Sequence, residues 1–288
     1  MHSLLFCYQS NPYGGRMQEL KKKGKQMNIL FTIDRGYVKR LAKCIQSIIR
    51  FPSEDGYDIY IMHSDLESGD ETYLRRETEN TDVRIHFVGI NIEETDFPES
   101  DRYPLQIYYR IFASFFLPQN LEKIIYLDAD TIVINPLNEL WKMEFNGNYF
   151  LACTHIRKVL NKINRIRLGI KEERPYINSG VMLMNLTELR KRQSYSEMKE
   201  YVKKYRKVLT LPDQDIITAL YGDKIGLLDT MVYNLSDRML AIYNGDMGHK
   251  KRDIDWVREH TVVIHYYGKQ KPWNKNYRGV LDVFYKEL

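Results

Sequence analysis

The sequence is poor in cysteine and has no long apolar run, and each absence narrows the class of protein. Its 288 residues include three cysteines (Cys7, Cys44 and Cys153), an odd number without the spacing of a zinc site. We therefore expect no disulfide framework and a reducing compartment. No apolar stretch approaches the roughly 18–20 residues that span a bilayer, and the N-terminus lacks the basic start of a signal peptide. These absences predict a soluble, cytoplasmic protein.

Positive charge is moderate in amount and unevenly distributed along the chain. The net charge is +5, and much of the excess lies in residues 156–174 and 189–208. Such clusters are typical of solvated helix faces, but they also attract phosphates on a substrate or on an anionic membrane. The aromatic and basic C-terminal stretch 274–288 has the same two interpretations, a solvated surface or peripheral membrane contact. No nucleic-acid-binding motif accompanies the charge, so we expect no nucleic-acid partner.

The first 26 residues differ from the rest of the chain. Their stretch "QELKKKGKQ" is charged and interrupted by a glycine, and it shows no core-forming period. We expect an N-terminal extension over residues 1–26, either poorly ordered or an artefact of cloning or start-site choice. Residues 27–288 are then expected to form one domain, a length that can bury a full α/β core.

Short apolar runs and helical patterns alternate along the chain. In the first half they predict strands over 28–34, 57–63, 83–90 and 124–134, with helices over 37–51, 65–79 and 104–118. In the second half they predict strands over 148–155, 176–186 and 261–268, with helices over 196–209 and 212–222. This alternation favours an α/β fold with a Rossmann-like, mostly parallel sheet flanked by helices.

Two aspartates interrupt the apolar run "IIYLDADTIVI" (124–134). Ligands of parallel sheets bind at the carboxyl ends of strands, where Asp34, Asp128 and Asp130 all fall. We therefore expect the three carboxylates to share one site. Asp128 and Asp130 repel each other in a low dielectric, and a divalent cation relieves that repulsion. Oxygen ligands favour Mg²⁺ or Mn²⁺, and an added imidazole favours Mn²⁺.

The aspartate pair has two competing interpretations. One aspartate could cap a turn while the other forms a salt bridge. The letters "DADTIV" also fit the nucleophile motif of haloacid-dehalogenase-type phosphatases, and "GDKIGLLD" (222–229) is similar to the acidic motif of those enzymes. That nucleophile normally lies on the first strand, whereas three predicted strands precede Asp128, so we prefer the metal site.

The stretch "HYYGKQKPW" (265–273) combines a histidine, a glycine and a lysine. The apolar residues before it predict a strand that ends on His265. Gly268 lets the backbone approach a ligand closely, and Lys271 can meet an anionic oxygen. A buried histidine with a surface lysine is the alternative, but the spacing favours a site for a metal and a diphosphate.

Six stretches, taken together, resemble family 8 retaining glycosyltransferases of the GT-A fold. They are "NILFTIDRGYV", "YYRIFASFFLP", "IIYLDADTIVI", "YINSGVMLMNL", "LPDQDIITALY" and "HYYGKQKPW", and they follow the family's order from about Met27 to Trp273. The family includes bacterial lipopolysaccharide galactosyl- and glucosyltransferases, general stress protein A-like proteins and glycogenin. The resemblance implies transfer of a hexose from UDP-glucose or UDP-galactose to a saccharide or glycolipid acceptor, with Mn²⁺ or Mg²⁺ as cofactor.

The resemblance also implies roles for residues at matching positions. The metal ligands would be Asp128, Asp130 and His265. Contacts to the nucleotide, its diphosphate and the adjoining sugar would come from Thr32, Ile33, Asp34, Tyr37, Arg110, Ala129, Gly268 and Lys271. The sugar pocket would be completed by Asn178, Ser179 and Gly180 and by the two expected catalytic residues, Asp213 and Gln214. Among these, Asp34 would accept from uracil, Tyr37 would stack on it, and Gln214 would lie beneath the anomeric carbon.

Gln214 and two departures from the family pattern bear on mechanism and substrate. A double displacement needs a carboxylate near the anomeric carbon, so Gln214 favours front-face attack, in which the departing phosphate oxygen accepts the acceptor's proton. Arg35 and Gly36 follow Asp34 where many relatives have a second aspartate, and Arg35 could meet a phosphate or merely face solvent. His155 stands near a position where many relatives carry aspartate, which leaves the donor sugar open.

Two further classes compete with an active transferase. A catalytically weak, nucleotide-sugar-binding stress protein would keep the same fold. A nucleotidyltransferase would need a phosphate-binding loop near its N-terminus, and "FTIDRGY" (31–37) is not one. The intact set of Asp128, Asp130, His265 and Lys271 favours the active enzyme.

Overall fold

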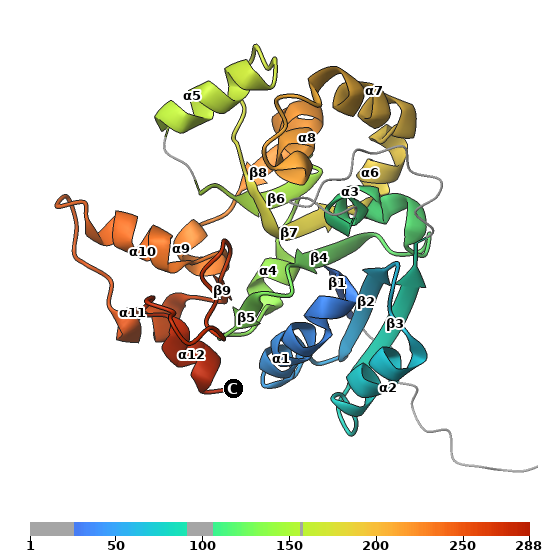
Figure 1. Ribbon diagram of the computed structural model, residues 1–288, viewed down its shortest axis with the longest axis vertical. Coiled ribbons are helices and arrows are strands. Elements are labelled where there is room, and N and C mark those ends of the chain that lie inside the picture. The colour runs from blue at the N-terminus through green and yellow to red at the C-terminus, as the bar shows by residue number, and fades with distance from the viewer. Residues whose placement is uncertain (1–25, 91–105, 156–157) are drawn as a thin grey trace, which may run out of the picture.

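Strands and helices alternate from Met27 onward in the computed structural model, which describes residues 26–90, 106–155 and 158–288 (Figure 1). The strands are β1 (Met27–Thr32), β2 (Tyr57–His63), β3 (Val83–Gly89), β4 (Lys123–Leu127), β5 (Thr131–Val133), β6 (Phe150–Cys153), β7 (Asn178–Asn185), β8 (Ile225–Leu227) and β9 (Val263–His265). The predicted extension over 1–26 lies, apart from its last residue, outside the described residues.

Most of the helices are short, and they connect or flank these strands. They are α1 (Val38–Ile49), α2 (Ser68–Arg76), α3 (Gln106–Phe116), α4 (Asn138–Lys142), α5 (Lys158–Arg167), α6 (Leu186–Arg192), α7 (Tyr195–Tyr205), α8 (Pro212–Tyr221), α9 (Thr230–Tyr233), α10 (Asp237–Asn244), α11 (Ile254–His260) and α12 (Asp282–Lys286). Two 3₁₀ turns cover Arg35–Tyr37 and Gly222–Lys224. Among these helices, none is long and apolar enough to cross a membrane.

Seven strands form one sheet in the order β3-β2-β1-β4-β7-β6-β8. The pairs β1·β2, β1·β4, β2·β3 and β6·β8 are parallel, whereas β7 runs antiparallel to both β4 and β6. The prediction of a mostly parallel α/β sheet is therefore confirmed.

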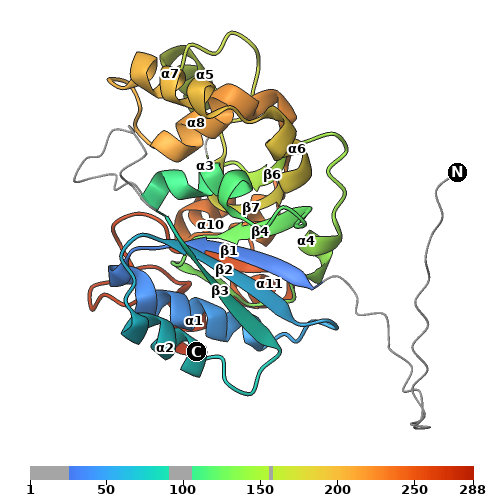
Figure 2. The same cartoon turned by 90° about the vertical axis from the view of Figure 1, so that its right-hand side faces the viewer.

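Helices cover both faces of this sheet, which explains why its strands are apolar without alternation. Ile29 and Phe31 of β1 pack in one core with α1, whereas Leu30 between them packs in the opposite core with α3. Figure 2 shows α1 and α2 on one side of strands β1 to β3 and α3 on the other. All seven residues of β2 are buried. The strand ends are consequently held by packing on two sides.

The aspartate pair was predicted at the end of a buried strand, and that prediction is confirmed, although the apolar run 124–134 contains two strands rather than one. β4 ends at Leu127, β5 begins at Thr131, and the Thr131 N–H donates to the Asp128 carbonyl (3.1 Å), closing a turn between them. β5 then leaves the main sheet and pairs antiparallel with β9. The apolar pattern could not reveal this turn, because the residues on its two sides are equally buried, although they lie in different sheets.

A third apolar core surrounds the β5·β9 sheet and includes residues of α9 to α12. The C-terminal stretch 274–288 contributes to this core, where Leu281 is fully buried and Phe284 is 2% exposed. The Tyr266 hydroxyl donates to the Leu281 carbonyl (2.8 Å) and fixes the start of α12. The aromatic side chains of this stretch are therefore packed against this core, whereas its basic side chains Lys275, Arg278 and Lys286 are exposed.

Candidate active site

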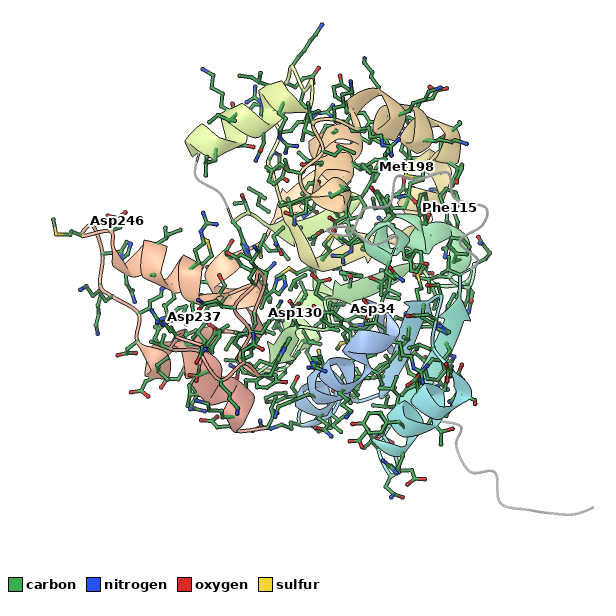
Figure 3. The ribbon with its side chains drawn as sticks, in the orientation of Figure 1. Asp34, Phe115, Asp130, Met198, Asp237 and Asp246 are labelled. Atoms are coloured by element: carbon green, nitrogen blue, oxygen red, sulfur yellow. The ribbon has the colours of Figure 1, made fainter. Side chains whose placement is uncertain are left out.

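The carboxyl ends of β1 and β4 open into a cavity of about 330 Å³. Helix α3 and the start of α8 complete its walls. The predicted residues that line it are Thr32, Ile33, Asp34, Tyr37, Arg110, Asp128, Ala129, Asp130, Ser179, Asp213 and Gln214. Figure 3 shows Asp34 and Asp130 close to the centre of the molecule, on the sides of β1 and β5 respectively. The expectation that these carboxylates share one site thus agrees with the geometry.

Asp128 is oriented by three neighbours. Its backbone N–H donates to the Gly180 carbonyl (2.8 Å), which ties the turn to β7. Its Oδ1 accepts from the Tyr126 hydroxyl (2.7 Å) and lies 2.9 Å from Nη1 of Arg110. A side chain at position 180 would fill the remaining space, since an added Cβ would lie 2.6 Å from Oδ2 of Asp128 and 2.1 Å from Cε1 of His265.

His265 reaches the aspartates because β9 pairs with β5 in a fixed register. Thr131 lies opposite His265, so the imidazole adjoins the turn that carries Asp128 and Asp130. Its Nε2 is 3.5 Å from Oδ2 of Asp128 and 3.2 Å from Oδ1 of Asp130. Lys271 completes the group by donating to Oδ2 of Asp130 and to the Tyr266 carbonyl. Burial alone would raise the pKa of Asp130, but His265 and Lys271 hold it well below the usual value of a carboxyl.

A chain of hydrogen bonds fixes the tautomer of His265. The Gly180 N–H donates to Oδ1 of Asn178 (3.1 Å), so that oxygen also accepts from the Asn234 amide (2.9 Å). Asn234 must then present its own Oδ1 to Nδ1 of His265 (3.0 Å), which makes Nδ1 the donor. In the neutral ring, the form that binds a metal, the lone pair of Nε2 then faces the two carboxylates.

These three residues fit a divalent metal. One potential ligand atom from each of Asp128, Asp130 and His265 lies within 4.8 Å of the others. The Nε2 atom of His265 is buried and has no hydrogen-bond partner. An unprotonated nitrogen beside two carboxylate oxygens is a ligand set suited to Mn²⁺, and the Nδ1 bond to Asn234 is the outer contact that ligating histidines usually make.

Arg110 connects the aspartate turn to the start of α8. Its Nη1 lies 2.9 Å from Oδ1 of Asp128 and 3.2 Å from Oδ2 of Asp213, and its guanidinium carbon lies 4.5 Å from the centre of the Tyr126 ring. Burial alone would lower the pKa of Arg110, yet Asp128 and its other neighbours raise it. Burial raises the pKa of Asp213, which Arg110 and the Ser179 hydroxyl partly offset. A buried cation thus lies at the junction of two carboxylates.

The opposite wall offers a carboxylate and an aromatic ring. Burial raises the pKa of Asp34, and a backbone hydrogen bond from Gly36 only partly offsets it. Tyr37 is 37% exposed, so its ring is available to a ligand. Arg35 pairs with Glu67 and with Asp70 (3.0 Å), which supports the solvent-facing interpretation of this residue rather than a phosphate contact.

Four other residues named from the sequence lie beside the cavity or away from it. Asn178 and Gly180 are not among its lining residues and support His265 and Asp128 from behind. Gly268 has a φ of +89° and open space around it, a backbone geometry that favours glycine. His155 is buried, and its Nε2 donates to the Asn234 carbonyl (2.9 Å), so it contacts the support of the site.

Sequence reasoning missed Tyr126 and Asn234. Tyr126 lies in the apolar run before the aspartates and looks like an ordinary core residue, but its hydroxyl bonds to both Thr32 (2.9 Å) and Asp128. Asn234 is fully buried in an otherwise apolar stretch. A buried amide needs hydrogen-bond partners, and this need is the local sign that Asn234 supports another residue. Gln106, Ile107 and Leu211 also line the cavity without having been predicted.

Solved structures of glycosyltransferases share this fold. The galactosyltransferase LgtC, in complex with donor and acceptor sugar analogs, superposes with a TM-score of 0.77 at 22% identity, covering 91% of this chain and 94% of that one. The glycosyltransferase GlyE of Streptococcus pneumoniae matches with a TM-score of 0.65 at 19% identity over 92% of this chain and 60% of that one. The fold is therefore the GT-A fold that the resemblance implied.

Sequence comparison gives the family. A lipopolysaccharide 1,2-glucosyltransferase of Escherichia coli is 26% identical over 254 residues, covering 86% of this chain and 73% of that protein. General stress protein A of Bacillus subtilis is 21% identical over 260 residues, covering 88% and 90%. The profile of glycosyl transferase family 8 matches residues 28–277, and the chain belongs to this family. That membership overturns the phosphatase interpretation of the DADT motif.

Proposed function

We propose that this family 8 glycosyltransferase is a retaining hexosyltransferase that uses a UDP-sugar donor and a divalent metal, Mn²⁺ or Mg²⁺. The observation that supports it best is the grouping of Asp128, Asp130 and His265 at the edge of a cavity, with the buried Nε2 of His265 directed at both carboxylates. UDP-glucose and UDP-galactose are the proposed donors. Asp34 would accept from the uracil N–H, and the exposed ring of Tyr37 would stack on the base.

The chemistry requires stabilisation of a diphosphate leaving group. A cation held by Asp128, Asp130 and His265 would offset the negative charge that develops on UDP. Lys271 would give up part of its contact with Asp130 to approach the diphosphate, and Gly268 would let the backbone come near it. Arg110, which lies between Asp128 and Asp213, would fix the position of the sugar relative to the diphosphate.

Retention of configuration is proposed to follow front-face attack. Gln214 lines the cavity beside Asp213, and an amide is a poor nucleophile. The acceptor hydroxyl would therefore attack from the side that UDP leaves, its proton passing to the departing phosphate oxygen while the new C–O bond forms. Asp213 and Ser179, which are hydrogen-bonded to each other, would position the sugar hydroxyls. A stable glycosyl-enzyme trapped in both Gln214→Glu and the wild-type chain would instead indicate double displacement.

The acceptor is proposed to be a saccharide or glycolipid of the cell surface, processed in the cytoplasm. The Escherichia coli relative is a lipopolysaccharide glucosyltransferase, which supports a lipid-linked saccharide. Peripheral contact with an anionic membrane would bring the enzyme to such an acceptor. His155 stands near a position where many relatives carry aspartate, and comparing the two donors by experiment decides between glucose and galactose.

The decisive test is UDP release from UDP-glucose and UDP-galactose, with Mn²⁺ and after chelation. We expect release only with metal, and a loss of roughly 100-fold or more in Asp130→Asn. The exposed Asp246→Asn is the matched control and should behave as wild type. UDP binding without release from any nucleotide sugar would favour the alternative, a catalytically weak binding protein of the same fold.

A further inference from the structure

Helix α5 is unusual because three of its apolar side chains face solvent. Leu160, Ile163 and Ile166 are 42%, 55% and 71% exposed. Residues three apart lie on one side of a helix, so the three form an apolar stripe along α5. A surface helix ordinarily turns such a stripe toward the core. Here the orientation is reversed, and the exposed stripe therefore needs an explanation.

Two polar side chains of α5, Arg167 and Asn161, hold the helix in this orientation. Arg167 donates to both carboxylate oxygens of Asp215 (2.8 and 2.7 Å), a residue buried in α8. Asn161 accepts from the Tyr176 N–H (3.1 Å) and donates to the Arg174 carbonyl (3.1 Å). The helix is thus fixed by specific bonds, with its apolar side directed outward.

Positive charge surrounds the stripe. From Lys158 to Lys171, with both ends included, five residues are basic and none is acidic, and Glu172 and Glu173 follow only after the helix. The end of α7 lies beside the end of α5, since a Cβ at Gly169 would meet the Tyr205 hydroxyl at 2.1 Å. The exposed cations of this region are Lys162, Lys171, Lys203, Lys204, Arg206 and Lys207. An apolar stripe flanked by cations is complementary to an anionic lipid surface.

The stripe is also connected to the cavity. Arg167 donates to the Val208 carbonyl (2.5 Å), which places the chain after α7 against the last turn of α5. Val208 and Leu211 are 37% and 38% exposed, and Leu211 lines the cavity. Helices α5, α7 and α8 gather at one end of the molecule, and the C-terminus lies at the other (Figures 1 and 2).

We propose that Leu160, Ile163 and Ile166, with the exposed cations around them, form a docking face for anionic membranes. The apolar stripe enters the boundary between headgroups and acyl chains, and the cations bind lipid phosphates. This inference rests on the proposed function only in so far as a lipid-linked acceptor would need such contact. It assigns that contact to α5 rather than to the stretch 274–288, whose aromatic rings pack against the third core. The face adjoins Leu211, so a membrane-bound acceptor lies near the cavity.

The test is co-sedimentation of the full chain with phosphatidylcholine vesicles, with and without phosphatidylglycerol. Wild type should pellet with the anionic vesicles, and Ile163→Asn/Ile166→Asn should lower the partition coefficient roughly tenfold or more. Lys162→Gln/Lys171→Gln should lower it by about fivefold for each lysine. The control is Leu227→Asn/Val280→Asn, which removes two similarly exposed apolar residues elsewhere and should retain wild-type binding.

Other outcomes would overturn the proposal. Equal pelleting with neutral and anionic vesicles, no pelleting of wild type, or unchanged pelleting of Ile163→Asn/Ile166→Asn would each do so. A wild-type mass in solution of twice 34.4 kDa, reduced to one chain in that variant, would make the stripe an interface between copies. Metal-dependent UDP release in the absence of vesicles should be the same in wild type and variant. If wild type releases no UDP in the presence of metal, the proposed function is contradicted, but the docking face is not affected.

Discussion

Single residues that do not line the cavity support the proposed metal site. Asn234 is fully buried, and its amide connects Asn178 to Nδ1 of His265. The orientation of that amide follows from a backbone N–H, which can only donate. Asn234 is therefore a positioning residue for His265, through which it directs a lone pair at Asp128 and Asp130.

Replacing Asn234 by alanine should weaken metal binding. Without the amide, Nδ1 has no fixed partner, and the imidazole can rotate or change tautomer. We expect Mn²⁺ affinity, measured by electron paramagnetic resonance of the free ion, to fall roughly 10- to 100-fold. Imidazole ¹⁵N shifts should show that the metal-free variant has lost the Nδ1–H form. Asn274→Ala, at an exposed position, is the control. Unchanged affinity and tautomer in Asn234→Ala would refute the role.

His155 should make folding stability depend on pH. Burial, with a smaller contribution from His265, lowers the pKa of His155 from 6.5 to about 3. Between those values the unfolded chain binds a proton that the folded chain excludes, so stability rises with pH. Acidification from about pH 7.5 to pH 5 should cost about 2 kcal/mol through this group.

Urea unfolding of the metal-free protein at both pH values measures this loss. His155→Asn can still donate to the Asn234 carbonyl but has no proton to gain, so its pH dependence should be smaller by that amount. The exposed His249→Asn should keep the wild-type dependence. Identical slopes for His155→Asn and wild type would show that His155 is not held neutral by the fold.

Residue type and position were enough to predict part of the site. Asp128, Asp130 and His265 end or adjoin apolar runs, and carboxylates with an imidazole suggest a metal without any coordinates. Tyr126 and Asn234 could not be found in this way. Tyr126 bonds to Thr32 and Asp128, and Asn234 bonds to His265. The partners Thr32 and His265 are distant in the sequence, so these contacts appear only in the folded chain.

Among the secondary-structure elements, α5 and α8 depend on one buried carboxylate. Asp215 accepts from Arg167 on α5, from the Tyr176 hydroxyl (2.8 Å) and from the backbone N–H groups of Thr210 and Leu211. The last of these contacts orders the entry to α8, which begins with Pro212 and carries Asp213 and Gln214. The position of the cavity wall thus follows from a bond network outside the cavity.

Arg167→Met should destabilise the protein by about 2–3 kcal/mol, because it leaves the Asp215 carboxylate buried with fewer donors. Lys162→Met on the same helix is the matched control, and at an exposed position it should change the free energy of unfolding by less than about 0.5 kcal/mol. Chemical denaturation measures both. Equal stability of the two variants would mean that the ion pair does not hold α5 in place.

Most elements of the main sheet were predictable, whereas the change of sheet at the aspartates was not. β2 matches the predicted strand 57–63 from end to end. All seven of its residues are buried, and a short, largely apolar run of this length predicts a buried strand. The run 124–134 satisfies the same pattern but divides between two sheets. An apolar pattern predicts that a residue is buried, but it does not show which strand or helix the residue packs against.

For the molecule as a whole, ligand binding should raise the melting temperature. UDP with Mn²⁺ at about 100 times its dissociation constant should raise the melting temperature by roughly 5 °C. Asp130→Asn should lose the Mn²⁺-dependent part of this shift, because Asp130 is a proposed ligand beside His265. Asp246→Asn, on the loop far from the site in Figure 3, should keep it. A full shift in Asp130→Asn would place the metal elsewhere.

The pairing of β5 with β9 also has a consequence during synthesis. Thr131 and His265 are partners in the register, although about 130 residues separate them along the chain. A ribosome therefore completes both aspartates long before it adds the imidazole that joins them. Closing so long a loop is entropically costly, and only the finished chain can assemble all three groups. Premature termination anywhere before β9 leaves the two aspartates without their third partner.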